Sequence, residues 1–166
     1  MELLHVGCGG EALPPWLFCT KETRLDIDPN CHPDIVASMV DMGDIGPFDA
    51  VFSCHSLEHL PFHDVALALG EFWRVLRPGG CVVVFVPDLE GVSPDDEVLY
   101  TSPAGPITGF DLIYGHRPQV QGNSYMAHRS GFTRHTLAIA LGKVGFSDVN
   151  MTRASYCNLI GTARKP

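Results

Sequence analysis

A chain of 166 residues is long enough to fold as one domain around a single hydrophobic core. Hydrophobic residues make up 45% of it and charged residues 18%, a balance that excludes an intrinsically disordered chain. The formal net charge is -8, and there is no run of basic residues. Duplex nucleic acid is therefore not an expected partner, because binding to its phosphates requires a basic surface.

The compartment is indicated by what the sequence lacks. No apolar run approaches the roughly 20 residues that span a membrane, so no membrane partner is expected. The first residues, MELLHVGCGG, have neither the basic nor the apolar segment of a signal peptide. The six cysteines are scattered without a C-x-x-C pair, as reduced thiols usually are. These features predict a cytoplasmic protein.

Short apolar runs separated by turns predict the strands of a sheet. They lie at residues 3–6, 24–27, 34–40, 48–54 and 81–86. The last run, CVVVFV, is apolar at every position, which is typical of a strand buried on both faces in a parallel sheet. Two further strands are expected near the end of the chain, at residues 148–152 and 159–163.

Two helices are predicted between these strands. The first covers about 64–76 and ends at Arg77-Pro78-Gly79-Gly80, with apolar residues at helical spacing: Val65, Leu69, Phe72, Trp73 and Leu76. The second begins near Thr133, a good N-cap, and ends before Gly145. Strands that alternate with helices predict βαβ units and a mostly parallel sheet.

Residues 88–132 interrupt this alternation. They are rich in glycine and proline and contain aromatic residues. We expect an irregular insertion within one domain, and such segments are usually lids or binding loops.

The first predicted strand runs into the turn Gly7-Cys8-Gly9-Gly10. Glycines here let a ligand approach the backbone closely. Asp26 follows at the end of the second strand, at the spacing where nucleotide-binding folds place an acid that binds ribose hydroxyls. Spacing alone leaves open whether Asp26 binds a ribose or is a surface acid. Because Pro14-Pro15 prevents a long helix after the turn, a cofactor without phosphates fits better than a dinucleotide.

Together, these segments resemble the class I S-adenosylmethionine-dependent methyltransferases. The matching segments follow the family's order: LLHVGCGG, RLDIDP, VDMGDIGPFDAVFSCHSLEHL, RVLRPGG and GFT…LGKVGF. The resemblance implies an α/β fold, with a Rossmann-like, mostly parallel sheet and helices on both faces. It implies a single domain over residues 1–166, shortened at its N-terminus, that transfers a methyl group from S-adenosylmethionine to the oxygen or nitrogen of a small-molecule acceptor.

The resemblance also implies which residues bind the cofactor. Gly7, Cys8 and Gly9 would pass beneath its methionine part. Asp26 would accept hydrogen bonds from the ribose hydroxyls, with Ile27 beside it.

Other cofactor contacts are implied further along the chain. Asp41 would accept a hydrogen bond from the adenine amino group, with the backbone of Met42 beside the ring. Ser53 and Cys54, together with His55, would face the sulfonium.

The chain also departs from the family pattern. His5 stands where an acid is usual, Glu11 replaces a third glycine, and the usual helix before the first strand is missing. Weak cofactor binding would follow, or a sheet face covered by a partner subunit in a homodimer. A non-catalytic cofactor-binding module is therefore an alternative to an enzyme.

An acceptor that must lose a proton needs a general base. We expect this base among His55, Asp88 and His116, with His128 a further candidate. Asp88 ends the fifth strand, where open α/β sheets bind ligands.

The motif His55-Ser56-Leu57-Glu58-His59 raises a second alternative. It matches H-x-x-E-H, in which two histidines on one helical face bind zinc and the glutamate is the base. A helix is disfavoured here because Pro61 follows at once, so neither a zinc hydrolase nor any metal site is expected. A dehydrogenase is disfavoured too, because the chain has no Tyr-x-x-x-Lys pair.

Overall fold

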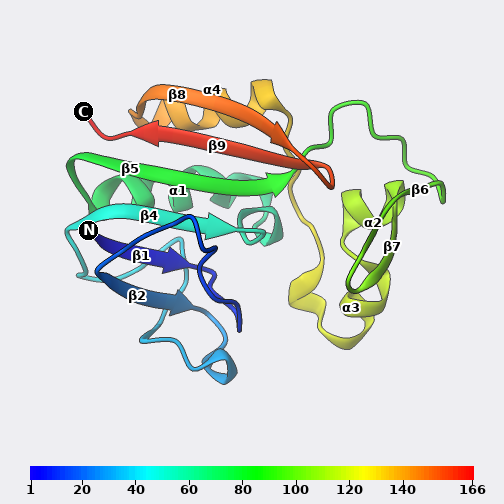
Figure 1. The fold of residues 1–166 in the computed structure, drawn as a ribbon, viewed down its shortest axis with the longest axis horizontal. Helices are drawn as coiled ribbons and strands as arrows, with labels where there is room; N and C mark the ends of the chain where they lie inside the picture. The colour runs from blue at the N-terminus through cyan, green and yellow to red at the C-terminus, as the bar shows by residue number, and fades with distance from the viewer.

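The computed structural model describes residues 1–166, which form one seven-stranded sheet in the order β3-β2-β1-β4-β5-β9-β8 (Figure 1). Neighbouring strands from β3 to β5 are parallel, whereas β9 is antiparallel to both β5 and β8. The strands are β1 (Glu2–Val6), β2 (Lys21–Asp26), β3 (Ile35–Val36), β4 (Phe48–Cys54), β5 (Leu76–Pro87), β8 (Ser147–Ala154) and β9 (Asn158–Arg164). The mostly parallel α/β sheet expected from the sequence is confirmed.

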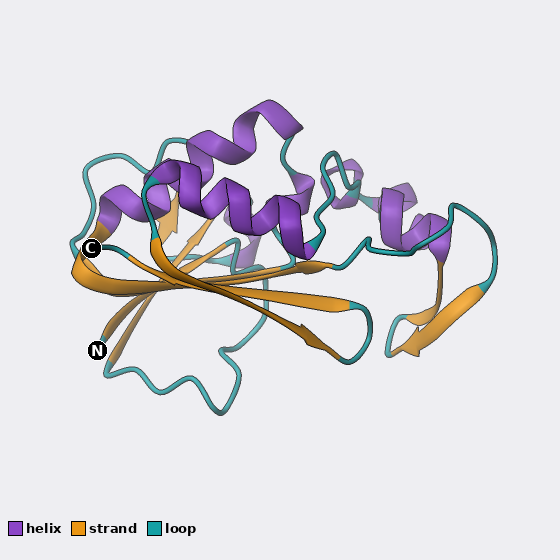
Figure 2. Cartoon of the chain, turned by 90° about the horizontal axis from the view of Figure 1, so that it is seen from above, coloured by secondary structure: helices purple, strands orange, loops and turns teal.

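Two long helices, α1 (Val65–Val75) and α4 (Arg134–Val144), cover one face of the sheet (Figure 2). Phe72 of α1 and Leu137 of α4 are fully buried against alternate residues of the central strands, which form the main core. The capping predicted for α4 is present, since the Thr133 side chain accepts from the Thr136 N–H and Gly145 ends the helix in a left-handed conformation. None of the helices has both the length and the apolarity that a membrane crossing requires.

The opposite face of the sheet has no helix, so the expectation of helices on both faces is wrong. Leu3, Ala50 and Phe52 form a small cluster here, covered by the segment that joins β1 to β2. Trp16 of that segment is half exposed, and its ring stacks on Phe85. The connections β1–β2 and β2–β4 contain no α-helix, and the first includes the two adjacent prolines.

Two predicted boundaries also differ. The strand expected at 34–40 is only Ile35–Val36, because the chain turns at once into a bridge between Ser38 and Asp41. Strand β5 begins at Leu76 and includes the Arg-Pro-Gly-Gly stretch, whereas the sequence predicted a strand only from residue 81.

The insertion, residues 88–132, is not irregular. It contains the hairpin β6 (Val98–Ser102) and β7 (Gly105–Thr108), followed by α2 (Gly109–Tyr114) and α3 (Arg117–Gly122). Figure 1 shows these elements beside the carboxyl ends of the parallel strands.

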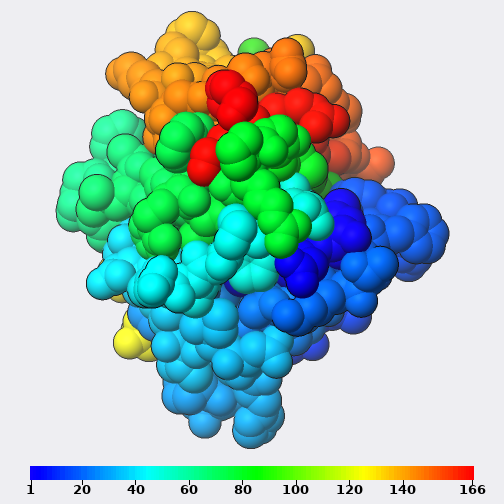
Figure 3. Space-filling view, turned by 90° about the vertical axis from the view of Figure 1, so that its left-hand side faces the viewer, coloured from blue at the N-terminus to red at the C-terminus, as the bar shows by residue number.

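The other end of the sheet is closed by chain termini and turns (Figure 3). The backbones of Gly79, Gly80 and Lys165 exchange hydrogen bonds there, and Arg77 pairs with Glu2 at 2.7 Å. Ligand binding is therefore expected only at the carboxyl ends of the strands.

Candidate functional site

Two adjoining cavities open where the parallel strands end. The larger has a volume of about 1000 Å³ and is lined by the first glycine turn, the end of β2 and the end of β4. The smaller, about 260 Å³, lies between the end of β4 and the insertion. His55, His59 and Met126 line both cavities and so mark their junction.

The glycine turn forms one wall of the larger cavity. Gly7 and Gly9 both have positive φ, +64° and +49°, which favours glycine. The two differ in their surroundings. A Cβ on Gly7 would overlap the Ser56 side chain, whereas a Cβ on Gly9 would meet no atom within 4 Å. Gly7 is therefore needed for packing, and Gly9 leaves its backbone open to a ligand.

Asp26 holds this turn in place from the end of β2. Its Oδ2 accepts from the Gly9 N–H at 2.7 Å, and its Oδ1 accepts from the Asp28 N–H at 2.9 Å. Each carboxylate oxygen can accept a second hydrogen bond. Cys8 and Ile27 line the same cavity, so this part of the predicted site lies together.

The predicted adenine contacts are not brought to the cavity. The Met42 side chain is buried in the core, and its N–H donates to Glu71 at 2.9 Å. Asp41 is exposed on the far side of the short turn that begins at Ser38. The cavity is lined instead by Ser38 and Met39, because β3 ends earlier than the sequence suggested.

At the end of β4, Ser53 and Cys54 differ in role. Ser53 is fully buried, and its hydroxyl hydrogen-bonds that of Ser56 at 2.6 Å, so it stabilises the turn after β4 and does not line a cavity. Cys54 lines the larger cavity. Burial, helped by the charge of Glu58, raises the pKa of its thiol to about 11, which keeps it neutral and unreactive.

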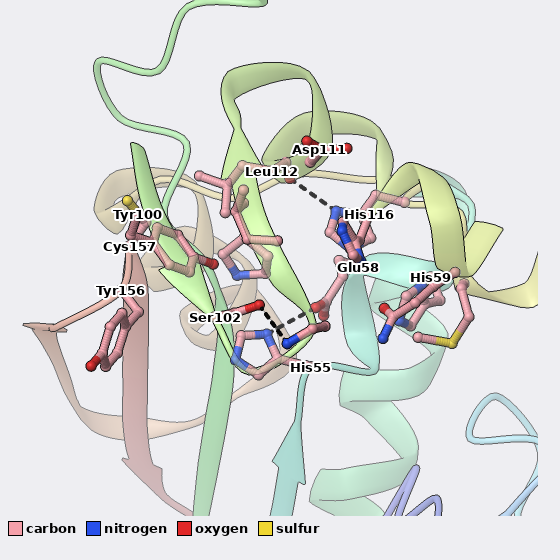
Figure 4. Close-up of a pocket in the computed structure, with 16 residues that line it drawn as sticks. His55, Glu58, His59, Tyr100, Ser102, Asp111, Leu112, His116, Tyr156 and Cys157 are labelled. Carbon is pink, nitrogen blue, oxygen red and sulfur yellow. Dashed lines mark hydrogen bonds and ion pairs between the residues drawn. The ribbon is translucent and has the colours of Figure 1, made fainter. Parts of the chain in front are cut away.

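His55 follows directly, with a positive φ of 50°. Its N–H donates to the carbonyl of Phe85, and its ring Nδ1 lies 3.3 Å from Glu58 Oε1 (Figure 4). Burial lowers the pKa of His55, but the hydrogen bond and charge of Glu58 outweigh it, so the pKa is raised overall.

Of the other predicted bases, His116 and His128 line the smaller cavity. Asp88 lines neither. Its side chain is buried and ion-paired with Arg153 at 2.6 Å, so its negative charge is already neutralised. Asp88 is therefore placed as a structural residue rather than as a base.

The H-x-x-E-H motif does not form the zinc-protease helix. Only Leu57–His59 is helical, as a single 3-10 turn, and His55 precedes it in a left-handed conformation. The motif nevertheless supplies two members of a cluster of potential metal ligands. Ligand atoms of Glu58, His59 and His128 lie within 4.8 Å of one another.

His128 reaches this place because the insertion returns along the 3-10 turn. The N–H groups of Arg129 and Ser130 both donate to the carbonyl of Glu58, at 2.8 and 3.1 Å. The N–H of His128 donates to the carbonyl of Tyr114. No spacing in the sequence indicated that a residue so far along the chain would join the motif.

The fold is that of the class I methyltransferases. Residues 4–84 match the family model of the methyltransferase domain, and the rest of the chain continues the same fold. Residues 4–84 belong to that family, and the resemblance to the S-adenosylmethionine-dependent methyltransferases is confirmed.

Solved structures share this fold at low sequence identity. A methyltransferase from Mesorhizobium loti superposes with a TM-score of 0.70 at 18% identity, over 99% of this chain and 90% of that one. The N-methyltransferase NodS from Bradyrhizobium japonicum, in complex with S-adenosylhomocysteine, superposes with a TM-score of 0.63 at 15% identity, over 99% of this chain and 78% of that one. A possible exported protein from Bordetella parapertussis superposes with a TM-score of 0.66 at 18% identity. The match covers 99% of this chain but only 61% of that protein's chain. No curated protein matches the sequence.

Proposed function

We propose that this methyltransferase binds S-adenosylmethionine in the larger cavity and a small-molecule acceptor in the smaller one. The observation that carries the proposal is that the two cavities meet at His55 and His59. Methyl transfer requires a nucleophile aligned with the methyl carbon and sulfur, and water kept away.

The larger cavity suits a nucleoside without phosphates. Gly9 offers open backbone, and Asp26 has acceptor capacity left for ribose hydroxyls. We place the adenine contacts at Ser38 and Met39, which line this cavity, instead of at Asp41 and Met42. Cys54 lies at the end of β4, toward the sulfonium.

The smaller cavity suits a polar acceptor. It is lined by imidazole rings and by polar tips from the hairpin, including Tyr100 and Ser102. We propose a hydroxyl or amine as the methylated group, and the insertion as the lid that holds it.

His55 is the proposed general base. In neutral His55, Nδ1 donates to Glu58, so Nε2 is free to accept a proton. S-adenosylmethionine, held by the glycine turn and Asp26, would supply the methyl group with its sulfonium sulfur as the leaving group, and Nε2 of His55 would take the proton that the acceptor loses. His55→Gln should slow transfer by about 10²- to 10⁴-fold.

Calorimetry with S-adenosylhomocysteine tests the cofactor site. Asp26→Asn should weaken binding about ten- to a few hundred-fold, because each hydrogen bond to a carboxylate contributes about 1.5–3 kcal/mol. Asp44→Asn, at an exposed acid away from both cavities, is the matched control and should bind as the wild type does. No binding by the wild-type protein would contradict the proposal. Binding without transfer to any acceptor would favour a non-catalytic module.

The proposal extends to compartment and partners. All six cysteines are free thiols, which supports the cytoplasm. The helix-free face supports a homodimer, with Phe18 83% exposed there, and size-exclusion chromatography with light scattering tests it. Duplex nucleic acid is not a proposed partner of so acidic a chain.

A further inference from the structure

We propose that Glu58, His59 and His128 form a binding site for a divalent cation of the zinc type. The site lies on the wall of the smaller cavity, which all three residues line. The evidence for the cation site is the geometry of these three residues alone. A role of the cation in binding the acceptor rests on the proposed function.

The three ligand atoms are close enough to share one ion. They lie within 4.8 Å of one another. Two ligands bound to zinc at 2.0–2.1 Å in tetrahedral geometry are about 3.4 Å apart. Side-chain rotations of roughly 1 Å therefore bring these atoms onto a cation, without movement of the backbone.

Both histidines present the right nitrogen. His59 Nδ1 lies 3.2 Å from the carbonyl oxygen of Ala127, and His128 Nδ1 lies 2.9 Å from that of Leu112. A carbonyl only accepts, so each Nδ1 carries the proton and each Nε2 keeps its lone pair. Metal-binding histidines are typically oriented by this hydrogen bond from the other ring nitrogen to a carbonyl or carboxylate.

Glu58 supplies the strongest argument. Only 1% of the residue is exposed, and its two oxygens differ. Oε1 faces His55, whereas Oε2 is buried with no hydrogen-bond partner (Figure 4). A buried carboxylate oxygen without a partner is costly, and a bound cation would remove that cost.

The donor set defines the class of cation. Two imidazoles and one carboxylate are the ligands of catalytic zinc sites, which keep a further position for water or substrate. Mg²⁺ prefers oxygen ligands and is a poor match. In the smaller cavity, the remaining position would face an acceptor oxygen or nitrogen. His116 lines the same cavity, and its Nδ1 is also buried without a partner.

The test uses untagged, chelator-treated protein titrated with Zn²⁺ in a calorimeter. Wild type should bind one equivalent, and His128→Gln should weaken binding by about 100-fold or more, since even loss of an outer hydrogen bond costs 10- to 100-fold. His63→Gln is the matched control, because that histidine is 81% exposed and lines neither cavity, and it should bind as the wild type does. Circular dichroism verifies that each variant folds, and His59→Gln replaces His128→Gln if the latter does not.

Cobalt identifies the ligands. Co²⁺ bound at this site should give visible absorption without a thiolate charge-transfer band. A thiolate band, or equal affinity in wild type and His128→Gln, would overturn the site in favour of a histidine pair that simply packs.

Calorimetry with S-adenosylhomocysteine separates the two proposals. Cofactor binding without zinc binding contradicts only the cation site, and zinc binding without cofactor binding contradicts only the proposed function.

Discussion

The backbone N–H of Arg129 donates a 2.8 Å hydrogen bond to the carbonyl of Glu58. This hydrogen bond holds the end of the insertion against the turn that follows β4. It places the insertion's histidines against the HSLEH motif, so both cavities depend on a part of the chain outside the family's matched residues 4–84.

The two glycines of the first turn should respond differently to alanine. In Gly7→Ala the new Cβ would overlap the Ser56 side chain at a positive φ, so the melting temperature should fall by several degrees or more. In Gly9→Ala the side chain enters open space, so stability should fall by about 1 kcal/mol from the positive φ alone. Affinity for S-adenosylhomocysteine should nevertheless fall sharply in Gly9→Ala.

Thermal unfolding and calorimetry on both variants separate packing from binding. Gly142→Ala is the control, since that glycine has no neighbour within 4 Å, has no positive φ and lines neither cavity. Full cofactor affinity in Gly9→Ala would show that the cofactor does not pass over this turn.

Ser38 and Asp41 test where the adenine lies. Ser38→Phe should fill part of the larger cavity and weaken S-adenosylhomocysteine binding at least tenfold. Asp41→Asn should leave affinity within about twofold, because Asp41 does not line the cavity. The reverse outcome in competition binding would restore Asp41 to the site.

Asp88 should behave as a structural residue. Asp88→Asn removes a buried charge paired with Arg153 and should lower the free energy of unfolding by about 1–3 kcal/mol. Cofactor affinity should not change. Denaturant unfolding measures the first quantity and calorimetry the second. A transfer rate that falls while stability stays unchanged would return Asp88 to the list of bases.

The fold of the insertion should depend on pH through Asp111. Burial raises the pKa of this carboxyl, but hydrogen bonds from Arg117 and Thr108 outweigh it, and the pKa is far below the usual value. A lowered pKa stabilises the folded form at pH values above the unfolded carboxyl's pKa of about 3.9. This contribution is lost as the pH falls through the lower, folded-state pKa.

Hydrogen exchange of α2 and α3 measures this contribution. At neutral pH, Asp111→Asn should lower protection there by about 1–3 kcal/mol, with the sheet unaffected. Asp96→Asn is the control, because Asp96 also pairs with Arg117 but is 72% exposed, and its loss should change little. Equal effects of the two substitutions would mean that Asp111 does not hold the insertion together.

Much of the fold was predictable because local patterns and packing agree. The apolar runs around β1, β4 and β5 fall on strands, and Thr133 and Gly145 limit α4 as its capping pattern predicted. The helix-free face was anticipated only as an alternative, from the missing N-terminal helix, because the sequence pattern does not show which connections lack a helix.

The site was predictable only where its residues follow consecutive predicted strands. Gly7 and Gly9 come directly after β1 and Asp26 ends β2, and the carboxyl ends of these parallel strands meet at one edge of the sheet. The sequence placed Asp41 in the adenine site because it predicted a strand over residues 34–40. The strand ends at Val36, so Ser38 and Met39 line the cavity instead. His128 could not be predicted, because its position is set by backbone hydrogen bonds between distant segments, which leave no pattern in the side chains.

Because one face of the sheet has no helix, the stability of its first strands should be coupled to ligand binding. Strands β1 to β3 carry most of the larger cavity, yet α1 and α4 cover them on one side only, and β3 is an edge of two residues. Because β3 pairs with β2 over only two residues, this edge of the sheet should open locally before β5 and β9 do. A ligand that bridges the glycine turn and Asp26 is bound only by the closed form, so part of its binding energy is used to order these strands. Cofactor affinity in this small enzyme is therefore also a measure of how well its first three strands are folded.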